Sequence, residues 1–127
     1  MVSYDATTET VRVTVRPAYL DGKSDALARQ FVFAYFVRIE NQGPGEVQLL
    51  RRQWTITDAD GHVQRVEGAG VVGRQPVLAA GEAHEYHSVC VLPTFEGTME
   101  GTYLMQREGG ARFHARIPRF HLVALAN

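Results

Sequence analysis

The stretch QFVFAYFVRIE, residues 30–40, carries the strongest strand signal in the chain. Apolar side chains occupy successive positions here, so an extended backbone would present them on both faces. A strand that is apolar on both faces is covered on both sides over part of its length. We therefore expect a central strand with two apolar faces, one formed by Phe31, Phe33, Tyr35, Val37 and Ile39 and the other by Val32, Ala34 and Phe36.

Alternating apolar and polar residues predict a second strand upstream and a third downstream of this stretch. Upstream, Val11 to Val15 shows the two-residue period of a half-buried strand, and Pro17 marks its end or an edge bulge. Downstream, the turn-forming cluster at residues 41–45 precedes a strand from Glu46 to about Thr57. Its inward face is expected to hold Leu50, Arg52, Trp54 and Ile56, with Arg52 emerging near the rim.

The remaining chain continues as short strands separated by turns. Asp60-Gly61 is a tight hairpin signal. Further strands are expected at about His62–Val66, Glu82–Leu92, Gly101–Arg107 and Arg112–Val123, with turns at Thr94–Gly97 and Glu108–Gly110 and one short helical turn at Asp25–Arg29. About seven strands with regular turn spacing predict an all-β sandwich of two antiparallel sheets, like fibronectin type III or immunoglobulin domains.

Composition places the chain among ordinary globular proteins. It has 127 residues, of which 45% are hydrophobic and 21% charged, so we expect one domain over residues 1–127. A net charge of −1 argues against nucleic-acid binding. The single cysteine is typical of a reducing compartment, and no stretch has the length of a signal peptide or membrane span, so we expect a cytoplasmic protein without membrane insertion.

Charge is nevertheless segregated along the second half of the chain. Residues 75–106 contain four acids and no Lys or Arg, whereas residues 107–119 contain four arginines against one glutamate. Two such segments could attract each other or separate partners. Solvated strand faces are the simpler interpretation.

Gly68, Gly70 and Gly73 spell GxGxxG, a pattern that in nucleotide-binding folds places backbone amides against a pyrophosphate at a helix N-terminus. Pro76 and the β-branched pair Val71 and Val72 disfavour a helix here. The chain also has a single lysine, Lys23, far from this motif. We therefore interpret the three glycines as structural, allowing positive φ or tight crossing between sheets, and we expect no cofactor and no bound nucleotide.

No catalytic or metal-binding set is apparent. His84 and His87 would point to opposite faces of one strand, and the other histidines have no spaced cysteine partner, so no metal site is expected. Cys90 lies in an apolar run and is expected to be an inert core residue. Because no nucleophile or acid–base pair stands out either, we expect a protein that is not an enzyme.

Several stretches of the sequence resemble the bacterial ApaG family. They are EGAGVVGRQP at residues 67–76, GTMEGTY at residues 97–103 and IPRF at residues 117–120, together with Tyr86, Ser88 and Phe113. The resemblance covers nearly the full chain. It implies a fibronectin type III-like sandwich, a link to cobalt and magnesium efflux, and domains that mediate protein contacts in eukaryotic F-box and DNA-polymerase-interacting proteins, with no catalytic residues to carry over.

Two functional hypotheses follow. The first is a protein-interaction module whose contact surface includes Val71, Val72, Arg74 and Gln75, because sandwich loops and sheet edges are common docking sites. The second is a small-ligand protein in cation homeostasis that holds phosphate at the glycine loop or a divalent cation at Glu82, Glu85, Glu96 and Glu100.

Overall fold

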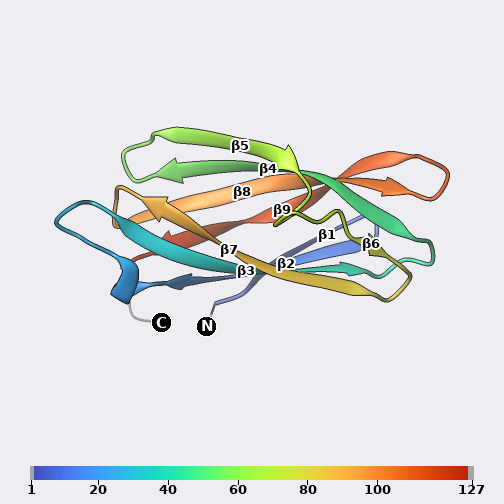
Figure 1. Ribbon diagram of the computed structural model, residues 1–127, viewed down its shortest axis with the longest axis horizontal. Coiled ribbons are helices and arrows are strands. Elements are labelled where there is room, and N and C mark those ends of the chain that lie inside the picture. Colours follow the sequence, from blue (N-terminus) through green and yellow to red (C-terminus); the bar gives the residue numbers. More distant parts are fainter. Residues whose placement is uncertain (1, 126–127) are drawn as a thin grey trace.

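A computed structural model describes residues 2–125; Met1 and residues 126–127, which belong to the expected domain, lie outside the described residues. Two antiparallel sheets pack face to face, as the sequence predicts (Figure 1). The first has the order β1-β2-β3-β7 and consists of β1 (Tyr4–Thr8), β2 (Val11–Tyr19), β3 (Phe31–Asn41) and β7 (Ala83–Leu92). The second has the order β5-β4-β8-β9 and consists of β4 (Val47–Asp58), β5 (Val63–Ala69), β8 (Glu96–Arg107) and β9 (Arg112–Val123), with the short β6 (Val77–Leu78) paired to the start of β4.

The core lies between the two sheets and is rich in aromatic residues. Trp54 is 2% exposed, and its indole meets the rings of Tyr35, Tyr103 and Phe120 at centroid distances of 5.3, 6.4 and 5.9 Å, all edge to face. Edge-to-face pairs add stabilisation beyond area burial. Alternate residues of β3 and of β4 point into the core, which is the two-residue period seen in the sequence. The side chains at these positions pack one sheet against the other.

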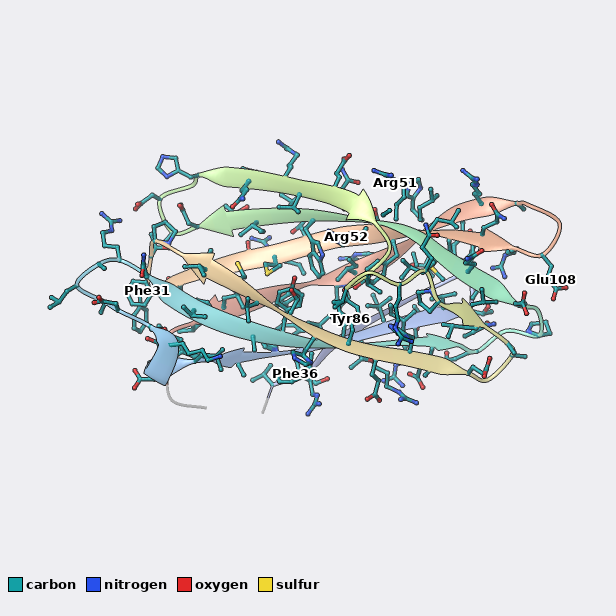
Figure 2. All side chains as sticks on the ribbon, in the orientation of Figure 1. Phe31, Phe36, Arg51, Arg52, Tyr86 and Glu108 are labelled. Atoms are coloured by element: carbon teal, nitrogen blue, oxygen red, sulfur yellow. The ribbon has the colours of Figure 1, made fainter. Side chains whose placement is uncertain are left out.

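The outer face of β3 differs from the expectation of a covered strand. Ala34 is 6% exposed and Val32 is half-buried, but Phe36 is 37% exposed on the side that faces away from the sandwich (Figure 2). Phe36 therefore does not belong to the core. No third layer covers this face within residues 2–125. Ala34 lies between Ala18 of β2 and Val89 of β7 in the same sheet.

The inward face of β4 also differs, because the strand contains a β-bulge. The register with β8 shifts between Leu49 and Arg51, so the extra residue Leu50 leaves the alternation. Leu49 is fully buried, and Leu50 is only half-buried. The expected inward set is therefore correct from Arg52 onward and wrong for Leu50.

Some elements were missed or misplaced. The sequence pattern did not predict β1 or β6, so the described chain has nine strands in place of about seven. The expected turn at Thr94–Gly97 is too long, since β8 already begins at Glu96. Residues 25–29 form a hydrogen-bonded turn, in which the N–H of Arg29 donates to the carbonyl oxygen of Ala26, and not a helix. Asp25 and Gln30 pair as an isolated bridge around it, and the 3₁₀ helix η1 lies earlier, at Asp21–Lys23.

The two long sides of the sandwich are closed differently. On one side β9 lies against β1, and the backbone N–H of Arg116 donates to the Thr8 hydroxyl at 3.0 Å. On the other side β7 and β5 are the sheet edges. The connection from β5 to β6 descends along this side (Figure 1). It contains the glycine motif and closes the open side of the core.

Candidate functional site

The β5–β6 connection is built around a tight reverse turn at residues 71–74. Val71 and Arg74 exchange both backbone hydrogen bonds, at 2.8 and 3.0 Å. The central residues Val72 and Gly73 have φ values of 46° and 75°. Positive φ at both central positions is the pattern of a type I′ turn, which strongly prefers Asn-Gly. Glycine meets this demand at the second position, whereas a β-branched valine at the first is strained.

Gly70 and Gly68 allow close approaches on either side of the turn entrance. A Cβ on Gly70 would lie 2.2 Å from the carbonyl oxygen of Arg74, and Gly70 has a φ of 62°. A Cβ on Gly68 would lie 2.8 Å from both terminal nitrogens of Arg52. The chain after Gly73 continues as loop and the strand β6, and no helix begins there.

Arg52 ties this loop to the second sheet. Its Nη1 donates to the carbonyl oxygens of Ala69 and Gly70 at 3.0 and 2.9 Å. The side chain points to the inner side of β4, toward Tyr86 (Figure 2). Charge-assisted hydrogen bonds of this kind are stronger than neutral ones. Arg52 therefore fixes the position from which the turn projects.

The four residues proposed from sequence as a contact surface lie together on this loop, but they differ in exposure. Val71 is 1% exposed and belongs to the core, whereas Val72 is 66% exposed at the tip. Gln75 donates from Nε2 to the carbonyl oxygen of Leu50 at 2.9 Å. Arg74 is exposed and forms no ion pair within residues 2–125. Val72, Arg74 and Gln75 are therefore the accessible part of the set, and Val71 is not accessible.

Sequence reasoning did not find a polar cluster that lies behind the loop. The hydroxyl groups of Tyr86 and Tyr103 are hydrogen-bonded to each other, and Tyr35 on β3 lies opposite Ser88 on β7. Burial raises the pKa of Tyr86 and of Tyr103, so both phenols stay neutral. The sequence places these rings on inward faces but gives no sign that β7 and β8, in different sheets, bring two hydroxyls together.

His84 connects β7 to the loop. Its ring stacks on Tyr86, with centroids 6.3 Å apart and planes inclined by 28°. Desolvation lowers the pKa of His84, and the positive charge of Arg74 lowers it further. His84 is half-buried and His87 is exposed on the outer face, so the prediction that these two histidines occupy opposite faces is confirmed.

The acids proposed as cation ligands do not converge. Glu82 accepts a hydrogen bond from the backbone N–H of Ala79 at 2.7 Å. Glu85 pairs with Arg38 at 2.6 Å, and Glu100 pairs with Arg119 at 3.6 Å. Glu96 begins β8, on the opposite sheet from Glu85. The carboxylates of Glu82, Glu85 and Glu100 therefore form separate surface interactions.

A different acidic group, which includes a histidine, forms at the β4–β5 turn. Asp58, Asp60 and His62 lie close enough to contact one ion, and His62 Nδ1 is 3.4 Å from Asp58 Oδ2. Desolvation acts to raise the pKa of Asp58, but backbone hydrogen bonds from His62 and Asp60 outweigh it and lower this pKa. The group is accounted for by the β4–β5 hairpin turn, in which Asp58 caps two backbone N–H groups.

Cys90 lies on the inner face of β7 and is 8% exposed. Burial raises the pKa of its thiol to about 11. The thiolate, which is the reactive form, is therefore scarce at neutral pH. The expectation of a core cysteine is confirmed.

The fold is a fibronectin type III-like sandwich of two antiparallel sheets, with a glycine loop closing one side. Known proteins then identify the family. The ApaG domain matches residues 21–107, and the chain belongs to the ApaG family. It is 55% identical to Protein ApaG of Paramagnetospirillum magneticum over 94% of this chain and 92% of that protein, and 54% identical to Protein ApaG of Rhodospirillum centenum with the same coverage.

Solved structures agree with this assignment. A Bordetella pertussis protein described as ApaA superimposes with a TM-score of 0.87 at 49% identity, over 89% of this chain and 92% of that one. A second X-ray structure gives a TM-score of 0.86 at 38% identity, over 93% and 89%. Among residues 2–125 there is no helix long and apolar enough to cross a bilayer.

Proposed function

We propose that this protein is a non-enzymatic protein-interaction module, and that the turn at residues 71–74 with Gln75 is part of its contact surface. The observation that carries the proposal is the conformation of Val72. This side chain is apolar, β-branched and 66% exposed, and its backbone has a φ of 46°. Strained residues of this kind persist where the surrounding structure over-determines them, and they cluster at functional sites.

The surroundings of Val72 support a docking role. Val71 anchors the turn in the core, and Arg52 holds the carbonyl groups at its entrance. Val72 is thus an exposed apolar side chain on a rigidly held turn, next to the unpaired charge of Arg74. The neighbouring edge strand β7 leaves one side of its backbone without a partner strand in residues 2–125, which is a common element of peptide docking.

The backbone of the loop also favours this proposal over phosphate binding. The N–H groups of Val71 and Arg74 donate across the turn, and that of Gly70 donates to Leu50. A phosphate site needs several amides that converge on the anion. Three of the amides around this motif already have backbone acceptors. On this proposal, any contribution to cobalt and magnesium efflux runs through the protein partner.

A single substitution at the tip tests the proposal. Val72→Asn introduces a residue that tolerates positive φ and removes the exposed apolar group. We expect it to abolish crosslinked capture of partner proteins from cell extract while leaving the fold intact. Val63→Asn, at a 50% exposed valine in β5, is the matched control. The proposal fails if no captured protein depends on Val72 or Arg74.

The alternative function is that of a ligand-binding protein. Calorimetric titration with magnesium, cobalt and nucleoside triphosphates distinguishes it from the interaction module. A one-to-one isotherm that is lost in Arg74→Gln would support an anion site at the loop. On the interaction proposal, all three titrations give only heats of dilution.

A further inference from the structure

The two outer faces of the sandwich differ in how their charges are arranged. On the first sheet the charged side chains neutralise one another in a row that crosses all four strands. Arg12 contacts both Asp5 and Glu40, and Arg38 contacts both Glu40 and Glu85. These three acids and two arginines form a continuous ion-pair row. This face therefore offers little unbalanced charge to a partner.

The outer face of the second sheet is net positive. Its outward positions carry five arginines against three glutamates, a balance of two positive charges: Arg51, Arg65, Arg112, Arg116 and Arg119 against Glu67, Glu96 and Glu100. Figure 2 shows Arg51 on this face, above β4. The arginines come from three strands that the sequence separates, so only part of this charge is visible in the segment at residues 107–119. We call these eight residues the basic face.

Most of the positive charge on the basic face has no anionic partner. Arg119 pairs with Glu100 at 3.6 Å, and Arg112 donates to the amide oxygen of Gln106. Arg51, Arg65 and Arg116 form no ion pair with any acid in residues 2–125. All three are exposed. They are available to a ligand without breaking an existing salt bridge.

Two shallow depressions divide the basic face, and each has an unpaired arginine in its wall. One, of about 230 Å³, is lined by Arg51 and Arg52 against one acid, Glu67. The other, of about 310 Å³, is lined by Arg116 and Arg119 against one acid, Glu100, so each keeps an excess of one positive charge. Gln53 and Thr102 line both depressions. Arg51 on β4 and Arg116 on β9 have β8 between them, so they lie roughly 10 Å apart across the strands.

We propose that the basic face binds an acidic segment of the protein partner, with carboxylates seated at Arg51 and Arg116. This inference rests on the proposed function and names the chemistry of its partner. Arginine binds carboxylates in a two-point geometry that suits aspartate and glutamate. Gln53 and Thr102 lie between the two arginines and supply neutral donors for the backbone of the bound segment.

The composition of the basic face favours an acidic polypeptide over nucleic acid. Its outward positions in residues 2–125 include no Phe, Tyr or Trp, so single-stranded bases have no ring on which to stack. A balance of two positive charges is also small for duplex binding, where contacts to about six or more phosphates are usual. Nucleic acid is therefore the competing outcome of the test.

Fluorescence anisotropy with a labelled poly-glutamate 20-mer tests the proposal directly. We expect saturable binding that weakens between about 50 and about 200 mM salt, because exposed charges are screened over this range. Arg51→Gln with Arg116→Gln should weaken binding about tenfold, as expected for the loss of two exposed charge pairs. In amide spectra, the shifts on titration should fall at Gln53 and Thr102.

A charge-matched control separates the basic face from overall charge. The double variant Arg16→Gln, Lys23→Gln also removes two positive charges, but at exposed positions outside the basic face. This control should bind poly-glutamate within about twofold of the parent chain, since its unpaired arginines are intact. Equal weakening in both double variants, no binding of poly-glutamate, or tighter binding of a 20-nucleotide single strand or duplex would each overturn the proposal.

Partner capture distinguishes failure of this inference from failure of the proposed function. If partners depend on Val72 but are retained by the Arg51→Gln, Arg116→Gln variant, the module stands and the basic face is not its acidic-segment site. If no partner depends on either surface, the proposed function itself fails.

Discussion

Gly68 lies so close to Arg52 that a Cβ atom on the glycine would be 2.8 Å from both terminal guanidinium nitrogens. Because Gly68 has no side chain, β5 leaves room for the guanidinium group of Arg52, which donates hydrogen bonds to the carbonyl groups of Ala69 and Gly70. This relationship explains the first glycine of the motif by packing, without a nucleotide.

Gly68→Ala should displace the Arg52 guanidinium and cost about 1–2 kcal/mol in the free energy of unfolding, the range expected when hydrogen bonds to a charged group are lost at a partly exposed site. Urea denaturation measures this cost. Gly45→Ala is the control, because an added Cβ there meets no atom within 4 Å. In an Arg52→Met background, Gly68→Ala should cost much less; equal costs in the two backgrounds would contradict the assigned role.

Val72→Asn should raise the free energy of unfolding by about 0.5–1 kcal/mol, because asparagine tolerates the positive φ that strains valine. Thermal and urea midpoints both report this change. At Val63 the same substitution should lower stability, since that residue lies in the strand β5, where β-branched residues are favoured. A lower midpoint for Val72→Asn would mean that Val72 is not strained.

His84 should titrate below its ordinary pKa, and Arg74→Gln should move this pKa upward, because the Arg74 charge is one cause of the depression after desolvation. Histidine resonances followed against pH measure both values. Arg116→Gln, on the far face, should leave His84 unchanged. Because the folded-state pKa lies below the unfolded value of 6.5, the contribution of His84 to stability is present above about pH 6.5 and is lost as pH falls through the folded pKa.

Cys90 should react slowly with thiol reagents in the folded protein. With a pKa of about 11 in place of 9.0, its thiolate fraction at pH 8 is about 100-fold lower than that of an unperturbed cysteine. The rate of reaction with a chromogenic disulfide reagent should rise by at least this factor when urea unfolds the chain, because burial also blocks access. A folded rate close to that of the unfolded chain would show that β7 opens readily.

Two errors in the sequence-based prediction show where periodicity fails. Leu49 and Leu50 are both apolar, so alternation alone could not decide which one faces the core, and the β-bulge chose Leu49. Phe36 looked like a core residue because large aromatic side chains are usually buried. It remains at the surface because no further layer covers the first sheet within residues 2–125, and Arg16 and His87 flank its ring.

The candidate site was only partly accessible to the same reasoning. The glycine spacing located the loop, and Pro76 with the β-branched pair argued correctly against a helix. The hydrogen bond between Tyr86 and Tyr103 joins the two sheets. The hydrogen bonds of Arg52 join β4 to the end of β5 and the loop that follows it. No local pattern encodes such pairs, because they depend on which strands become neighbours.

The amino-acid sequence by itself determined the all-β class, the approximate limits of most strands and the membership of the ApaG family, because alternation of side chains and turn-forming residues act over a few positions. Only the tertiary structure decided which charges remain unpaired. Arg51, Arg65 and Arg116 share one face because β4, β5 and β9 lie in one sheet, while Arg12 and Arg38 meet acids supplied by neighbouring strands. Strand order is set by the packing of two sheets around one core, and that order brings together residues far apart in the chain.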